Sequence, residues 1–244
     1  MSMEDDYKFL LKFVREGRIP LREVPMDFRS KELCEAALNV DSDSIYFIPK
    51  NLCDENMCLH AVKNSPAVIA HMDSSLITSK VAIAAVKKVG KLLFAVPEDK
   101  RTRKVCLEAV ANDGWALSHV PEILRDSDMY LAAVRSGRIR PEDVAWDENL
   151  CLEALKSQCQ VSFEDFPKEI VNEDFCEKAV RINAKLLEDL PDEFHTPRVY
   201  AAAIQTSIGA QMHMNVFILR EFLTDYARLV KDARNSEDEL PSPR

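Results

Sequence analysis

Apolar residues return along this chain at a step of 24 residues. The first apolar positions of the repeats are Val24, Ile48, Met72, Val96, Val120 and Val144, and two further repeats begin at Phe166 and Leu190. Within a repeat the apolar residues have helical spacing, as at Leu33, Ala37 and Val40. A period of this length predicts a solenoid, in which each unit buries its apolar face on its neighbours.

Three columns recur within the repeat. Proline takes the second position of six repeats: Pro25, Pro49, Pro97, Pro121, Pro167 and Pro191. Alanine stands thirteen residues after seven of the repeat starts: Ala37, Ala61, Ala85, Ala109, Ala133, Ala179 and Ala203. Three residues earlier the chain often has cysteine: Cys34, Cys58, Cys106 and Cys176. The sixth repeat keeps this motif at Cys151 and Ala154, but it is shortened, so that the next repeat starts after 22 residues.

These columns predict the elements of each unit. Proline is tolerated in the first turn of a helix, so each unit should begin with a short helical turn. A main helix of roughly ten to twelve residues follows, and polar residues suited to N-capping precede it: Ser30, Asp54, Asp126, Asp147 and Asn172. A connector then carries one inward-facing apolar residue: Ile45, Ile69, Leu93, Leu117 or Leu187. No segment shows sustained alternation of apolar and polar residues, so we expect no strands.

The ends of the chain depart from the repeat. Residues 1–23 resemble the second half of the fifth repeat, because both carry Gly-Arg-Ile seven residues before the next unit. We therefore expect one all-α domain over 1–234: a half-repeat cap at 1–23, about eight units forming a right-handed solenoid at 24–209, and a capping helix at 210–234. That helix has an apolar stripe that could also pair with a second copy, but its breadth favours capping and a monomer. The polar residues 235–244 are predicted to be disordered.

The composition of the chain disfavours several classes of partner and cofactor. The net charge of −9 disfavours nucleic acid and anionic membranes as partners, and five glycines disfavour glycine-rich phosphate loops. No C-x-x-C pair stands among the seven cysteines, so we expect neither a metal nor a cofactor. The start of the chain has no secretory-signal pattern, and no apolar run is long enough to cross a bilayer, so a cytoplasmic location is expected.

The segment Cys106 to Val134, CLEAVANDGWALSHVPEILRDSDMYLAAV, resembles a bacterial and protist repeat family catalogued as domain of unknown function 4116. Units of that family run L-x-A-V-x-x-x-G-x-x-L-x-x-[VA]-x-x-x-L-R-x-D. In degraded form the resemblance covers about residues 7–209; the first unit departs from it at Asp41-Ser42 and the sixth is shortened. It implies a helical array without established chemistry. It also suggests a bacterial effector, which could reach a host cell without a cleavable signal.

Two groups of residues are candidates for binding a partner protein. A basic column stands two residues after the alanine column and comprises Lys63, Lys87, Arg135, Lys156 and Arg181. Cations in the last turn of a helix also favour its dipole, which is the simpler explanation. The second group is the two tryptophans, Trp115 in the connector of the fourth repeat and Trp146 in the short turn of the sixth. A packing role is the first expectation for both, and a binding anchor is the second.

The sequence therefore favours a protein-interaction module, acting as an adaptor, inhibitor, immunity factor or delivered effector. An enzyme is the first alternative, with a pocket near the irregular sixth repeat built from His195, Glu164, Asp165 and Cys159. Nucleic-acid binding through the basic column is the second alternative. No familiar hydrolase, metalloprotease or phosphate-binding motif occurs, so catalysis is disfavoured.

Overall fold

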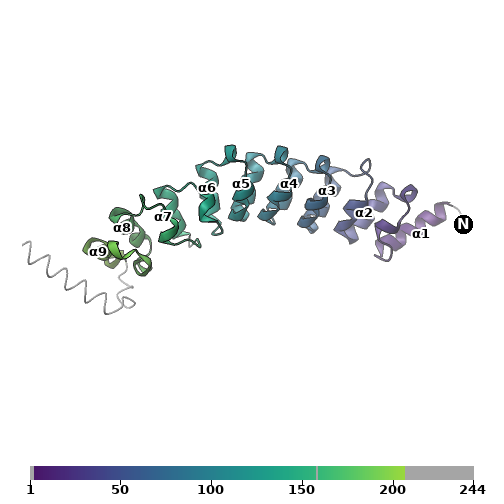
Figure 1. Ribbon diagram of the computed structural model, residues 1–244. Helices are drawn as coiled ribbons and strands as arrows, with labels where there is room; N and C mark the ends of the chain where they lie inside the picture. The colour runs from purple at the N-terminus through teal and green to yellow at the C-terminus, as the bar shows by residue number, and fades with distance from the viewer. Residues whose placement is uncertain (1–2, 158, 207–244) are drawn as a thin grey trace, which may run out of the picture. The chain divides into compact units, whose positions relative to one another are not determined.

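The computed structural model describes residues 3–157 and 159–206 (Figure 1). Every regular element in this part of the chain is a helix, which confirms the all-α class. The chain divides into two compact units, Met1–Ala145 and Trp146–Arg244, and each is described by itself. The capping helix predicted at 210–234 and the disordered tail predicted at 235–244 lie outside the described residues.

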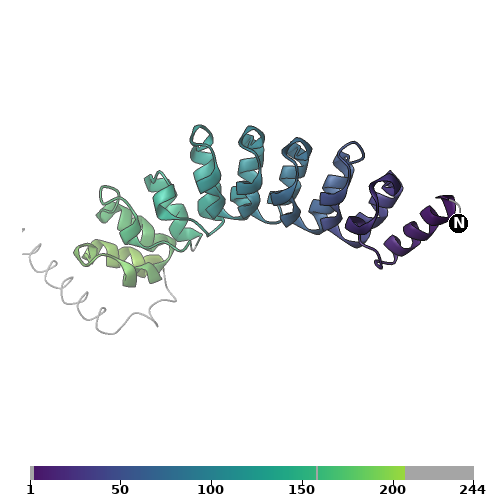
Figure 2. The same ribbon diagram turned by 45° about the vertical axis from the view of Figure 1, so that its right-hand side comes forward.

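In the described residues of each unit, α-helices alternate with short 3₁₀ helices. The α-helices of the first unit are α1 (Met3–Arg15), α2 (Lys31–Val40), α3 (Glu55–Asn64), α4 (Ser79–Val86), α5 (Arg103–Asn112) and α6 (Ser127–Arg135). Those described in the second are α7 (Glu148–Lys156), α8 (Glu173–Ile182) and α9 (Pro197–Thr206). In the first unit α3 packs on α4 and α4 on α5, so that successive helices lie side by side (Figure 2).

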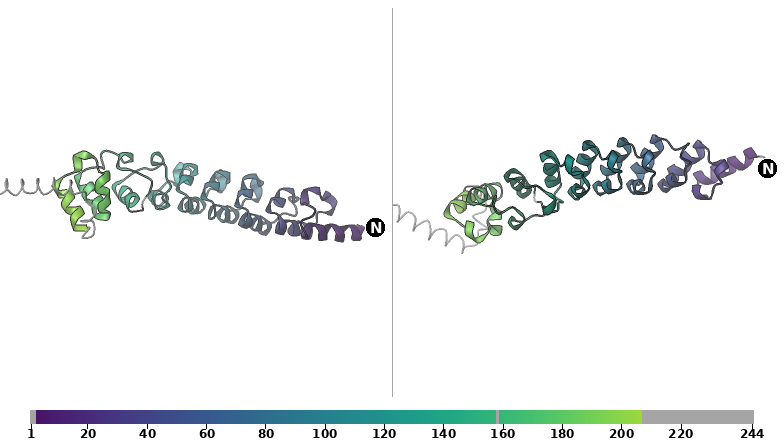
Figure 3. Two further views of the ribbon diagram at one scale, coloured as in Figure 1. Left: turned by 90° about the horizontal axis from the view of Figure 1, so that it is seen from below. Right: turned by 45° about the horizontal axis from the view of Figure 1, so that its top comes forward.

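The predicted connectors are themselves helical, which the sequence reading did not anticipate. Five of them are six-residue 3₁₀ helices: η3 (Ser42–Phe47), η4 (Pro66–His71), η6 (Gly90–Ala95), η8 (Gly114–His119) and η12 (Ala184–Asp189). In the first unit these helices lie beside the row of α-helices (Figure 3). The inward-facing residues expected in the connectors are buried there, as Leu93 and Leu117 show.

Three-residue 3₁₀ helices complete the chain. In the first unit they are η1 (Leu21–Glu23), η2 (Met26–Phe28), η5 (Ser74–Leu76), η7 (Glu98–Lys100), η9 (Glu122–Leu124) and η10 (Pro141–Asp143). In the second they are η11 (Phe163–Asp165) and η13 (Asp192–Phe194). Pro25, Pro97, Pro121 and Pro191 directly precede four of these turns as N-cap residues. The proline column thus starts a short helical turn, as predicted.

The main helices reach at most the lower end of the predicted length, and at two of them, α2 and α5, an aspartate ends the helix and starts the next one. From α2 to α9 they span eight to ten residues. Asp113 ends α5, and its carboxylate accepts a hydrogen bond from the Trp115 N–H at 3.2 Å, which begins η8. Asp41 does the same between α2 and η3. An aspartate that caps the following turn offers the backbone an alternative to further α-helix.

The predicted columns form the core. Ala61, Ala85 and Ala109 have no exposed surface, and neither do Cys58 and Cys106. Small side chains at these positions allow the α-helices to approach closely. The five predicted N-caps are all confirmed, each accepting a hydrogen bond from a backbone N–H of the first turn: Ser30, Asp54, Asp126, Asp147 and Asn172.

An arginine column, which the sequence reading missed, ties neighbouring repeats together. The Arg101 guanidinium donates from Nε to the Val96 carbonyl at 2.8 Å, from Nη1 to the His119 carbonyl at 3.0 Å and from Nη2 to the Phe94 carbonyl at 3.2 Å. Arg29 makes the same three kinds of contact at the first repeat, and Arg125 makes two of them at the fifth. The planar fork of arginine suits this bridging of several carbonyls.

Candidate partner-binding surface

The outward face of η6 and η8 carries exposed aromatic rings. Residues three apart in a 3₁₀ helix lie on the same face, so Lys91 stands beside Phe94 and Trp115 beside Ser118. Phe94 is 54% exposed and Trp115 is 41% exposed. The packing role expected first for Trp115 is therefore wrong, because η8 turns that side chain outward. We define the η6–η8 surface as Lys91, Phe94, Trp115, His119 and Arg140.

Contacts between repeats join these side chains into one surface. The Lys91 Nζ lies 4.1 Å from the centroid of the Trp115 ring, a cation–π contact. The ring centroids of Phe94 and His119 are 6.1 Å apart. Arg140 donates from Nη2 to the Ser118 Oγ at 3.2 Å. These contacts link η6 to η8, and η8 to the chain that follows α6.

The backbone under this surface is tightly held. Arg101 binds the carbonyls of both Phe94 and His119, which fixes η6 against η8. The Gly114 N–H donates to the Ser136 Oγ at 2.8 Å. A Cβ on Gly114 would lie only 2.3 Å from the Arg138 carbonyl oxygen, so glycine is what lets the next repeat come this close. Because the backbone under the rings is already held, little backbone entropy is lost when they bind.

The surface combines neutral rings with positive charge. Partial burial lowers the pKa of His119, and the charges of Arg101 and Arg140 lower it further. His119 is therefore a neutral aromatic side chain at pH 7. Lys91 and Arg140 are exposed and supply positive charge, although the Arg140 Nε also lies 3.6 Å from a carboxylate oxygen of Asp143.

The predicted basic column is exposed but largely balanced by acids. Its members stand at or next to the last turns of their helices: Lys63, Lys87, Arg135, Lys156 and Arg181. Lys87 pairs with Glu108 at 3.4 Å, Lys156 with Glu153 at 3.9 Å and Arg181 with Glu177 at 2.8 Å. Their positions at the helix ends support the simpler explanation of cations at helix C-termini. A role of the column in binding stays a prediction.

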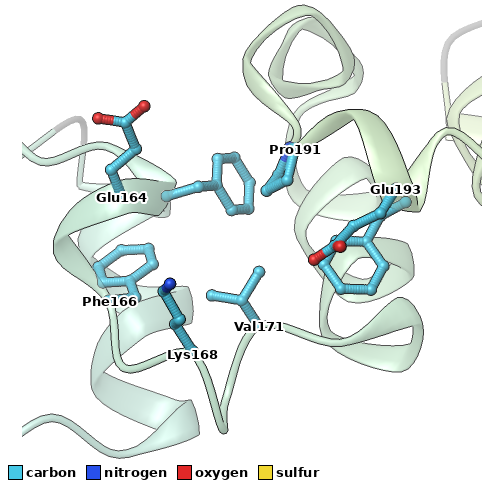
Figure 4. Close-up of a pocket in the computed structure, with 8 residues that line it drawn as sticks. Glu164, Phe166, Lys168, Val171, Pro191 and Glu193 are labelled. Carbon is cyan, nitrogen blue, oxygen red and sulfur yellow. The ribbon is translucent and has the colours of Figure 1, made fainter.

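The second unit contains Trp146 and a pocket. Trp146 is half-buried, and its ring centroid lies 5.1 Å from that of Phe166 in an edge-on contact. A pocket of about 280 Å³ opens beside Phe166 and has an apolar lining with polar groups at its rim (Figure 4). Val171 and Pro191 point toward the hollow, whereas the Glu164 carboxylate points away from it. Such a pocket suits one apolar side chain.

The four residues considered for an enzyme do not line this pocket together; Glu164 alone does. The Asp165 carboxylate accepts the Ser162 N–H at 2.7 Å in a capping box, and Cys159 is buried. His195 stands five residues after its repeat start, the position of the arginine column. Its Nε2 lies 3.3 Å from the Leu190 carbonyl and its Nδ1 lies 2.9 Å from the Tyr200 hydroxyl. Each of His195 and Asp165 thus has a structural role in its own turn.

Neither a metal site nor a membrane-spanning helix is found in the part of the chain that the structure describes. There, no three His, Cys, Asp or Glu side chains gather as metal ligands would. None of the described helices is long and apolar enough to cross a bilayer.

Comparison with known proteins found no match among protein-family models, curated proteins or solved structures. The resemblance of Cys106 to Val134 to the repeat family therefore remains a prediction from the sequence.

Proposed function

We propose that the chain forms a right-handed solenoid of about eight repeats, as the family catalogued as domain of unknown function 4116 is expected to do. Support comes from polar contacts between residues one repeat apart. Lys31 pairs with Asp54 at 2.6 Å, Arg103 pairs with Asp126 at 2.9 Å, and Thr196 donates to Glu173 at 2.6 Å. Each contact joins the start of one helix to the start of the next, which is how stacked repeats interact.

We propose that the function of this chain is to bind another protein through the η6–η8 surface. The observation that carries the proposal is the pair of exposed rings, Phe94 and Trp115, set beside Lys91 on a rigid backbone. Aromatic and arginine side chains supply most of the binding energy at protein interfaces. The positive charges select an acidic segment, and the rings provide contact area for an apolar side chain within it.

Nucleic acid is the less favoured occupant of the same surface. Aromatic rings beside cations also stack with single-stranded bases. The net charge of −9, however, opposes a densely charged polyanion more than it opposes a short acidic peptide.

The proposal can be tested with Trp115 as the reporter. The chain has two tryptophans, so a Trp146→Phe variant leaves the fluorescence of Trp115 alone. This variant is titrated with peptides that combine Asp and Glu with one Leu or Phe, and with matched peptides carrying Asn and Gln instead. We expect a saturable change for the acidic peptides that weakens as salt is added.

Two further variants, each also carrying Trp146→Phe, locate the binding. Phe94→Ser should weaken binding, whereas Ile123→Ser should leave it unchanged, because Ile123 is 94% exposed but lies outside the η6–η8 surface. Equal responses to acidic and amide peptides would overturn the proposal. So would equal losses in the two variants. Tighter, salt-sensitive binding of a single-stranded RNA would replace the proposed class of partner.

A further inference from the structure

Two thiols meet at the start of α3. The Cys53 Sγ lies 3.6 Å from the Cys58 Sγ. Asp54 is the N-cap of α3, so Cys53 directly precedes the cap and Cys58 is the fourth residue of the helix. Residues at these two positions pack together in many helices, where they fix the angle at which the chain enters. The contact between the thiols therefore follows from the local fold.

The same two positions meet in other repeats, but with other chemistry. In the fourth repeat the Cys106 Sγ donates to the Arg101 carbonyl at 3.6 Å. In the eighth repeat His195 contacts Tyr200 at 2.9 Å. Cys53 stands in the arginine column, at the position where the fourth repeat has Arg101. The second repeat is the only one with a cysteine at both positions.

Cys53 is also the accessible member of the pair. All seven cysteines lie in the described part of the chain, and Cys53 is the one among them that is not buried. The hydrogen bond from the Cys58 thiol lowers the pKa of Cys53, although partial burial and the Asp54 carboxylate oppose this. The same hydrogen bond and burial both raise the pKa of Cys58. Cys53 is thus the thiol that ionises first and reacts with an oxidant from solution.

We propose that Cys53 and Cys58 form a reversible disulfide when the protein meets a hydroperoxide. The Cys53 thiolate attacks one peroxide oxygen, hydroxide leaves and takes up a proton, and Cys53 becomes a sulfenic acid. The Cys58 sulfur then attacks the Cys53 sulfur, and its proton leaves with the displaced hydroxide as water. Two thiols and one hydrogen peroxide give one disulfide and two waters. The bond ties the turn before α3 to the first turn of that helix.

The test uses the full chain and hydrogen peroxide. After treatment the protein is unfolded, alkylated without reduction and cleaved with trypsin. Cleavage after Lys50 and Lys63 places both cysteines on one peptide, residues 51–63. We expect that peptide to lose alkylation at both cysteines and to weigh two hydrogens less, while dithiothreitol restores it. Peptides with Cys106 and Cys151 should stay alkylated, because burial raises the pKa of both thiols, that of Cys151 to about 12.

Two variants separate the steps. Cys58→Ala is tolerable in this column because Ala82 holds the same position in the third repeat. This variant should stop at the sulfenic acid of Cys53, which dimedone traps. Cys53→Ser should leave Cys58 reduced. The proposal is wrong if wild-type Cys53 gives the dimedone adduct in the same yield as Cys58→Ala. It is also wrong if oxidation joins Cys53 to a second chain instead, or if Cys106 reacts as fast.

Discussion

Gly114 offers the sharpest test of how closely the repeats pack. It is the first residue of η8, and its N–H donates to the Ser136 Oγ of the next repeat. A Cβ at this position would lie 2.3 Å from the Arg138 carbonyl oxygen and 2.8 Å from the Ala133 carbonyl oxygen. Both are backbone atoms, so no flexible side chain can move aside. Gly114→Ala must therefore push the two repeats apart.

The size of the effect follows from these distances. An ordinary contact needs about 3.4 Å, so the Arg138 backbone must shift by about 1 Å. Overpacking of this kind costs about 1–3 kcal/mol, and weakening the bond to Ser136 adds about 1 kcal/mol. Alanine also reduces the entropy of the unfolded chain, which returns about 0.4–1 kcal/mol. The net loss of unfolding free energy should be about 1–4 kcal/mol, or a fall in Tm of about 2–4 °C for each kcal/mol.

Urea denaturation of the full chain, followed by far-UV circular dichroism, measures this loss. Hydrogen exchange locates it, because the amides of α5 and α6 should lose protection while those of α8 do not. Gly137→Ala is the matched control. No atom lies within 4 Å of a Cβ there, but φ is +76°, so only backbone strain of about 1 kcal/mol is expected. A Gly114→Ala protein as stable as wild type would refute the close approach of the repeats.

Three further substitutions test other contacts of the first unit. Ala109→Leu, at a fully buried position, should cost about 1–3 kcal/mol by overpacking, and an unchanged urea midpoint would show that the alanine column faces solvent. Arg101→Lys should cost about 1–3 kcal/mol, because one ammonium cannot replace a guanidinium fork that reaches three carbonyls; a loss no larger than that of Arg135→Lys would contradict this bracing. Hydrogen bonds from the Met129 N–H and then from Arg103 lower the pKa of Asp126 in the folded protein. The Asp126 carboxylate therefore stabilises the fold above about pH 4, and this effect is lost as the pH falls through the pKa that Asp126 has in the folded protein. Asp126→Asn should therefore flatten the acid limb of the stability profile and remain more stable at pH 7 than Asp126→Ala, in urea titrations at several pH values.

Features that repeat were predictable from one sequence because packing imposes them. Ala109 and Cys106 recur at their columns since any larger side chain would separate two helices. The N-caps were equally accessible, because an aspartate or serine before an apolar run satisfies a free N–H wherever it occurs. The helical nature of the connectors was not accessible. Six residues of 3₁₀ helix make only two turns, which is too short for a periodic pattern to stand out.

The arginine column shows why some structural residues escape such reading. Arg29, Arg101 and Arg125 stand five residues after a repeat start, and their spacing could have revealed them. The second and third repeats have Cys53 and Ile77 at this position, which interrupts the pattern. The bonds go to carbonyls, which every residue has, so the acceptor side leaves no mark on the sequence.

The exposure of Trp115 is hard to predict for a related reason. Burial of a connector residue depends on which side of a two-turn 3₁₀ helix it occupies, and the neighbour Ala116 is buried where Trp115 is exposed. A shift of one residue therefore decides between a buried and an exposed side chain. A two-turn 3₁₀ helix has no α-helical apolar stripe that would show which residues face inward. Lys91 and Trp115 hold the same position in adjacent repeats, which is why they meet although 24 residues separate them.

The repeat contains two kinds of position. Inward positions are held by close contact between units, so they recur and indicate the fold. Outward positions of the long 3₁₀ helices face solvent and can differ from one repeat to the next, as Asp43, Ala67, Lys91 and Trp115 do at one column. A partner that binds along the array can be recognised only through such differences. It follows that the departures from the repeat, at Trp115 on the η6–η8 surface and at Cys53 in the arginine column, are where chemistry specific to this chain should be sought.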